Sequence, residues 1–113
     1  MTGPLATLRL KHAMLEVWGP DEHCARGHVL TRFPDGLTVP AAPNGDETLT
    51  DTLAHELAHH LYAELRHDAP SACLRGVAEG HGRRWTDAKH EEETAAYRLG
   101  LQLAAAMKAL KDG

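Results

Sequence analysis

Apolar residues recur along this chain with a helical period in its central part. Leucines stand at every fourth position there: Leu49, Leu53, Leu57, Leu61 and Leu65. Residues four apart lie on one face of an α-helix, so the pattern predicts a helix from residues 46–48 to about Arg66, with a leucine face that enters a core. Thr48, with Asp51 three residues later, predicts a capping box at its start, with Asp in place of the usual Glu.

The first part of the chain is divided by glycine and proline. Residues 4–18 space their apolar positions by three and four and end at a Gly-Pro pair, which predicts an N-terminal helix. Residues 28–33 and 37–39 are rich in β-branched and apolar side chains and flank a Pro-Asp-Gly turn signal. They predict a short β-hairpin whose second strand ends at Pro40.

The last part of the chain predicts one long helix over residues 82–111. One stripe of mostly apolar residues follows three-four spacing and includes one glutamate: Trp85, Ala88, Glu92, Ala95, Ala96, Leu99, Leu103, Ala106, Met107 and Leu110. Gly100 lies in this stripe and marks either a close helix contact or a break. The link over residues 67–80 has room for one helical turn at 71–75. The elements together predict a small α+β fold.

Candidate chemistry lies on the central helix, in His55-Glu56-Leu57-Ala58-His59. Because His55 and His59 are four apart, both can point at one metal ion, with Glu56 beside them as a general base. A pattern this short also occurs by chance. A purely structural helix, however, has no evident use for two histidines and a glutamate opposite its leucine face. The pattern therefore predicts a zinc site with an open coordination position.

The sequence offers two kinds of third ligand, which a catalytic zinc usually has. His81 stands between two glycines, which let the backbone turn sharply and approach a metal closely. Alternatively, Glu91, Glu92 or Glu93 could project from the last helix. Glu92 is the strongest of these, because it falls near the apolar stripe; it could equally orient a ligand histidine. We favour His81.

Two motifs in this order resemble those of the SprT-like, or Spartan-type, zinc metallopeptidases. Those proteins have His-Glu-x-x-His on a helix and then, after a loop, His-Gly-x-x-aromatic at the start of a second helix. Here the second motif is His81-Gly82-Arg83-Arg84-Trp85. The resemblance covers about residues 28–95. It implies a minimal zincin-like metallopeptidase domain over residues 1–113, with zinc held by His55, His59 and His81 and Glu56 as general base.

A weaker similarity is to the ImmA/IrrE-type peptidases. In those proteins an acidic, alanine-rich helix supplies a glutamate ligand. The run Glu91-Glu92-Glu93-Thr94-Ala95-Ala96 matches that pattern.

Composition narrows the class of protein further. A net charge of −4 argues against a surface that attracts nucleic acid as a whole, although Arg83 and Arg84 form a small basic patch. No signal peptide is visible and no apolar run approaches about 18 residues, so we expect no membrane partner. Cys24 and Cys73 make no disulfide framework, which favours a cytoplasmic protein.

The sequence therefore predicts a hydrolase, a zinc metallopeptidase that cleaves a protein or peptide substrate. A water activated by Zn²⁺ attacks the peptide bond, and Glu56 acts as general base. Tyr62, His60 and Arg84 are candidates for a donor that stabilises the oxyanion.

The alternative is a non-catalytic accessory protein of phage or mobile-element type, with a zincin-like fold and a structural metal. Glu56 favours the enzyme, because a structural zinc needs no base and usually has a fourth protein ligand. Substrate specificity and oligomeric state are left open.

Overall fold

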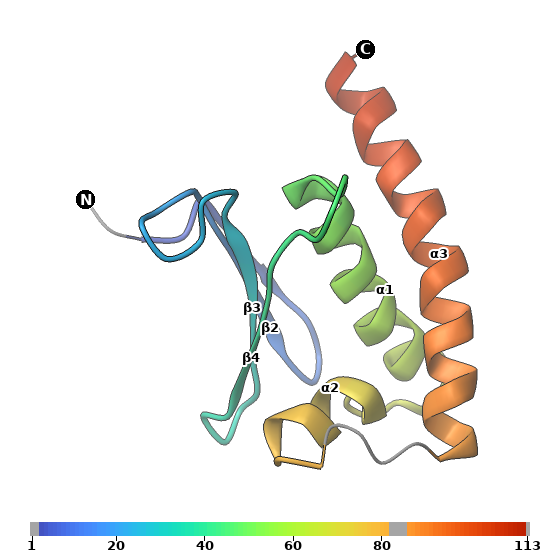
Figure 1. The fold of residues 1–113 in the computed structure, drawn as a ribbon. Coiled ribbons are helices and arrows are strands. Elements are labelled where there is room, and N and C mark those ends of the chain that lie inside the picture. The colour runs from blue at the N-terminus through green and yellow to red at the C-terminus, as the bar shows by residue number, and fades with distance from the viewer. Residues whose placement is uncertain (1–2, 82–85, 113) are drawn as a thin grey trace.

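The computed structural model describes residues 3–81 and 86–112, which form a four-stranded antiparallel sheet and three helices (Figure 1). The strands are β1 (Ala6–Arg9), β2 (Met14–Trp18), β3 (His28–Arg32) and β4 (Thr38–Ala41). The helices are α1 (Leu49–His67), α2 (Ala72–Ala78) and α3 (Asp87–Asp112). The strands lie in the sheet in their sequence order. The predicted α+β class is confirmed.

The predicted helix over residues 4–18 is wrong, because this segment forms β1 and β2. The two strands pair in a register that sets Ala6 opposite Val17 and Leu8 opposite Leu15. A short apolar run can satisfy both the helical and the strand period, and pairing decides between them. Here β2 pairs with β3 as well as with β1, so Leu15 and Val17 enter the core as alternate residues of a central strand.

β4 continues through Pro40, beyond the expected end of the second hairpin strand. This strand is at the edge of the sheet, with β3 as its one neighbour. Proline has no N–H to donate, and an edge strand has one side that needs no donor.

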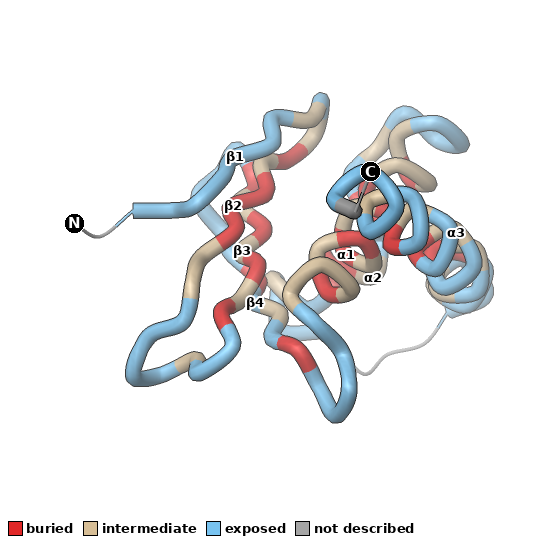
Figure 2. Tube along the Cα trace, turned by 90° about the horizontal axis from the view of Figure 1, so that it is seen from above, coloured by how far each residue is buried: buried red, intermediate tan, exposed pale blue. Residues whose placement is uncertain are grey.

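α1 lies between the sheet and α3, as both views show (Figures 1 and 2). Buried positions concentrate in β2, β3 and α1, whereas β1 is exposed (Figure 2). On the side of α1 that faces the sheet, the His60 ring lies 3.1 Å from Thr31 Oγ1 on β3. The packing of α1 on both neighbours determines which of its residues are buried.

The leucine face of α1 is not its core face. Leu65 is 84% exposed, and the other four leucines of the stripe are only half-buried. The buried residues of the helix are Thr52, Ala54, Glu56, Ala58, His59, His60 and Ala63. A helix with one layer on each side buries two faces, and here these faces carry small and polar residues.

The ends of α1 are close to their predicted places. Thr48 is the N-cap and Asp51 completes the capping box, which confirms that prediction. The helix ends at His67, and its C-cap, Asp68, is a left-handed residue whose carboxylate binds Lys11 and His12 from the turn between β1 and β2.

Gly100 makes the close helix contact that its place in the stripe suggested. A Cβ added there would lie 3.2 Å from the Cα of His55. The backbone of α3 therefore passes directly beside the first histidine of the motif.

α2 occupies the region where one helical turn was expected. Leu74 packs in a cluster with Ala13, Phe33 and Val39, which joins α2 to the sheet. Arg75 adds a paired contact with Asp35 in the β3–β4 turn, and its guanidinium lies 5.0 Å from the centre of the Phe33 ring. None of the helices in the described ranges is long and apolar enough to cross a membrane.

Candidate metal centre

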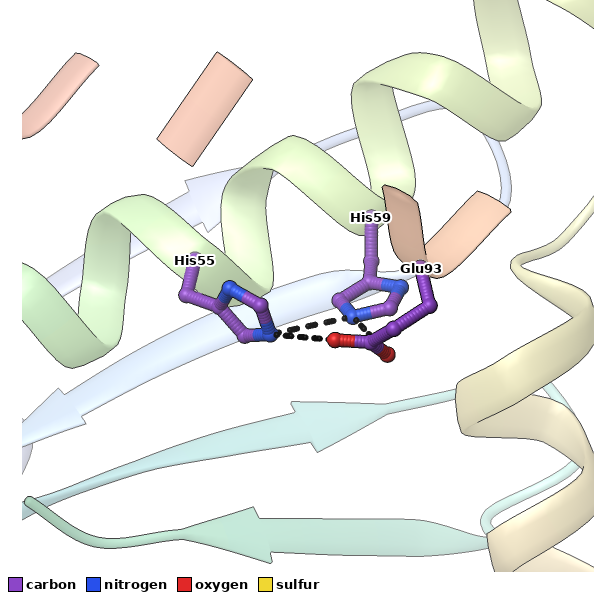
Figure 3. A group of neighbouring side chains, drawn as sticks. All are labelled: His55, His59 and Glu93. Carbon is purple, nitrogen blue, oxygen red and sulfur yellow. Dashed lines mark hydrogen bonds and ion pairs between the residues drawn. The ribbon is translucent and has the colours of Figure 1, made fainter. Parts of the chain in front are cut away.

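His55 and His59 on α1 meet Glu93 of α3 at one point (Figure 3). The two Nε2 atoms lie 3.2 Å apart. One carboxylate oxygen of Glu93 lies 3.3 Å from Nε2 of His55, and the other lies 3.2 Å from Nε2 of His59. α1 presents the histidines one turn apart, and the close passage of α3 at Gly100 sets Glu93 opposite them.

The donor set and its spacing fit a zinc ion. Four ligands at bond lengths of about 2.0–2.1 Å in a tetrahedron lie about 3.3 Å from one another. Two imidazoles and one carboxylate form a known set for catalytic zinc, and they leave one coordination position open. Glu56 stands beside them with its Oε2 buried and without a hydrogen-bond partner in the described structure. Such an orphan acceptor suits a site that takes up a polar ligand.

Glu92 contacts the His59 ring at Nδ1, the nitrogen that does not face His55 and Glu93. Its Oε2 lies 2.6 Å from Nδ1 of His59 and also accepts a hydrogen bond from Ser71 Oγ at 2.5 Å. Its Oε1 accepts a hydrogen bond from the Ala72 N–H at 2.8 Å. Because a carboxylate only accepts, Nδ1 of His59 carries the proton in this contact. In the neutral ring, Nε2 then keeps its lone pair, which is directed at the shared point with His55 and Glu93.

The charges around the two histidines are negative. Burial alone would lower the pKa of His59, but the hydrogen bond to Glu92 and the charge of Glu93 outweigh burial and raise it. Burial lowers the pKa of His55 and raises that of Glu56 to about 7. A cation at the shared point would offset the cost of holding these carboxyl groups together.

A second group of donors, His59, Cys73 and Glu92, also lies close together. Its donors are already in use, because Cys73 donates to the Lys89 carbonyl at 3.3 Å and both oxygens of Glu92 accept hydrogen bonds. Burial raises the pKa of the Cys73 thiol, which disfavours the thiolate that binds metals. The group with Glu93 is therefore the better candidate for a metal centre.

His81, the favoured third ligand in the sequence, does not join this group. The His81 side chain is exposed. The backbone N–H of His81 donates a hydrogen bond to the Gly76 carbonyl at 2.7 Å, near the end of α2. The rest of its motif, residues 82–85, lies outside the described residues. The structure thus favours the glutamate alternative over His81.

The three consecutive glutamates of α3 have three different environments. Glu93 faces both histidines, Glu92 supports His59, and Glu91 accepts a hydrogen bond from Tyr62 at 2.7 Å on the exposed side. The sequence identified all three as candidates and named Glu92 the strongest. It could not give the rotation of α3 about its axis, which decides among them.

A cavity of about 230 Å³ opens beside the metal centre. Its walls are the metal-site side chains together with four further residues, Cys73, Leu74, Val77 and Lys89. Two of the expected oxyanion donors point elsewhere, because Tyr62 binds Glu91 and His60 is buried against Thr31. The third, Arg84, lies outside the described residues.

Sequence reasoning missed Ser71, which is both the N-cap of α2 and a partner of Glu92. The signal that could have found the cap is a serine as the first residue of the helical turn expected at 71–75. Its contact with Glu92 depends on how α2 meets α3.

Comparisons with protein-family models, with curated proteins and with solved structures gave no match.

Proposed function

We propose that this protein is a zinc-dependent metallopeptidase with His55, His59 and Glu93 as metal ligands. The observation that carries the proposal is the approach of two Nε2 atoms and a carboxylate to within 3.2–3.3 Å of one another, with Glu56 buried beside them. The ligand set has the pattern of the ImmA/IrrE-type peptidases, in place of the three histidines of the SprT-like proteins.

Zinc, when bound, would act as a Lewis acid on the substrate carbonyl and favour deprotonation of water. Side chains of the protein transfer the proton and orient a metal ligand. Glu56 takes the proton of the attacking water and returns it to the leaving amine. Its orphan Oε2 is free for this exchange, because no described group competes for it. Glu92 keeps the His59 ring oriented, since it fixes Nδ1 and is itself held by two donors from the start of α2.

Two observations favour the enzyme over a non-catalytic accessory protein. A structural zinc usually has four protein ligands, whereas the group here has three in the described chain. A buried carboxylate without a partner is costly, and a general base is a reason to keep one. We place the activity in the cytoplasm, in line with Cys24 and Cys73 both being free thiols.

Hydrolysis of an unstructured protein such as casein, and of a mixed peptide library, tests this function. Zinc-loaded wild type is compared with Glu56→Gln and with Glu91→Gln, a matched change of an exposed glutamate. Glu56→Gln should retain zinc and lose activity by about 10²–10⁴-fold, because the amide cannot accept the proton of water. Zinc binding with no cleavage of any substrate by wild type would support the accessory protein instead.

A further inference from the structure

A furrow of about 410 Å³ begins at His55 and runs between α1 and α3. One wall is acidic, with Asp46, Glu47 and Asp51, and the other is apolar, with Tyr97 and Leu101. We infer that this furrow receives the side chain of a lysine or arginine of the peptide substrate, close to the scissile bond. The inference rests on the proposed peptidase function and adds a substrate class to it.

The furrow leads directly away from the metal centre. On α3, Tyr97 and Leu101 follow Glu93 at intervals of one helical turn. On α1, Asp51 precedes His55 by one turn, and Glu47 lies just before the helix begins. A substrate residue near the bond that is cleaved can therefore place its side chain in the furrow without leaving the site.

The two large side chains of the apolar wall are exposed to solvent. Tyr97 is 61% exposed and Leu101 is 58% exposed, and the two are neighbours on one face of α3. Folding leaves this adjacent pair in water beside the acidic wall, where a substrate side chain can cover it. The aliphatic part of lysine or arginine packs on such a surface, and a cation also interacts favourably with a tyrosine ring.

The acidic wall carries negative charge that no ion pair within the described residues neutralises. Asp51 is balanced by Lys108, whose Nζ lies 2.8 Å from its carboxylate. Asp46 and Glu47 form no ion pair within the described residues. Arg26 is near them, but its guanidinium donates to the backbone carbonyls of residues 43, 45 and 47, so it fixes the loop instead of pairing with a carboxylate.

The acidic and apolar walls together favour one kind of substrate side chain over the others. A metal ion would use the carboxylates and gain nothing from Tyr97 and Leu101. An apolar side chain would place no positive charge opposite Asp46 and Glu47, and an acidic side chain would be repelled by them. A long cationic side chain uses both walls.

Pairs of peptides test the inference. Each pair is identical except for lysine or norleucine at one position on either side of the cleaved bond, so that only the charge changes. For zinc-loaded wild type we expect kcat/KM to be about tenfold higher for lysine at one position. The double variant Asp46→Asn/Glu47→Gln should bring this ratio close to one. Glu91→Gln, which removes a charge from the exposed side of α3 outside the furrow, should keep the wild-type ratio.

The outcomes separate this inference from the peptidase itself. Cleavage of both peptides at equal rates would contradict the inference that the furrow binds lysine. The proposal that the protein is a peptidase would still hold. If no peptide is cleaved, the peptidase proposal fails, and fluorescence anisotropy with the same labelled peptides then decides on the furrow. Tighter binding of the lysine peptide, lost in the double variant, would uphold the furrow. Equal binding of both peptides would overturn it.

Discussion

Glu92 Oε2 lies 2.6 Å from Nδ1 of His59, in a position where Glu92 is only 2% exposed. The same carboxylate binds Ser71 and Ala72, so the start of α2 and the orientation of His59 depend on one side chain of α3. The candidate metal centre is therefore built from contacts among all three described helices.

Replacement of Glu92 tests this support. Glu92→Gln should weaken zinc binding by about 10–100-fold, because the amide is a poorer acceptor for the proton on Nδ1 of His59. Glu91→Gln is the matched control, since Glu91 contacts Tyr62 on the exposed side and should leave zinc affinity as in wild type. Competition with a chromophoric chelator measures both. Equal affinities for the two variants would remove Glu92 from the metal centre.

Substitutions of Glu93 and His81 test which of the two is the third zinc ligand. Glu93→Gln should lower zinc affinity by more than about 100-fold, because it removes a ligand, an effect larger than loss of an orienting partner. His81→Ala should change affinity by less than about threefold, because the exposed ring lies outside the donor group. Chelator competition on both purified proteins is the measurement. The reverse order would restore the three-histidine set of the SprT-like proteins.

Glu56 should make the metal-free protein less stable as the pH rises. Its pKa of about 7 in the folded state exceeds the ordinary 4.5, so the neutral form is preferred on folding. The stability associated with this group is complete below about pH 4.5 and is lost as the pH rises through 7. Metal-free Glu56→Gln should match wild type at pH 4 and exceed it by up to about 3 kcal/mol at pH 8.

Urea denaturation at both pH values, in the presence of a chelator, measures this difference. Glu91→Gln serves as the control for the loss of one carboxylate. A constant difference between Glu56→Gln and wild type from pH 4 to pH 8 would contradict the raised pKa.

Asp51 should contribute stability in the opposite pH range. The ion pair with Lys108, helped by the hydrogen bond from the Thr48 N–H, lowers its pKa to about 2. Its contribution is therefore present above the ordinary value of 3.8 and is lost as the pH falls through 2. Asp51→Asn should cost about 1 kcal/mol at pH 7, a modest value because the pair is partly exposed to solvent.

The same substitution should cost almost nothing near pH 2, which acid and neutral urea titrations can compare. Glu22→Gln, in an exposed loop, is the control. A cost for Asp51→Asn that persists unchanged at pH 2 would argue against the charged pair.

Gly100 should link helix packing to metal binding. A Cβ at this position meets the Cα of His55 at 3.2 Å, and backbone atoms cannot move aside cheaply. Gly100→Val should therefore destabilise the fold by about 1–3 kcal/mol and also weaken zinc binding, because it displaces α3 and with it Glu93. Ala105→Val, at an exposed position of the same helix, is the control. Normal zinc affinity in Gly100→Val would show that the contact does not position Glu93.

Local signals in the sequence predicted the central helix and the pair of histidines in its candidate metal site. The capping box of Thr48 and Asp51, and the four-residue interval of His55 and His59, involve residues within one or two turns of each other. Such features depend on helix geometry alone, so no knowledge of the rest of the fold is needed. The α+β class followed in the same way from a helical period and a turn signal.

Tertiary structure decided everything that depends on distant partners. Residues 14–18 became a strand because β1 and β3 pair with them on both sides, although their spacing also suits a helix. The approach of Glu93, and not His81, to the two histidines, and the contact of Glu92 with His59, depend on how α3 is rotated and how closely it passes α1 at Gly100. A side-chain period shows which residues share a face of one helix, but the angle between two helices arises only when they pack.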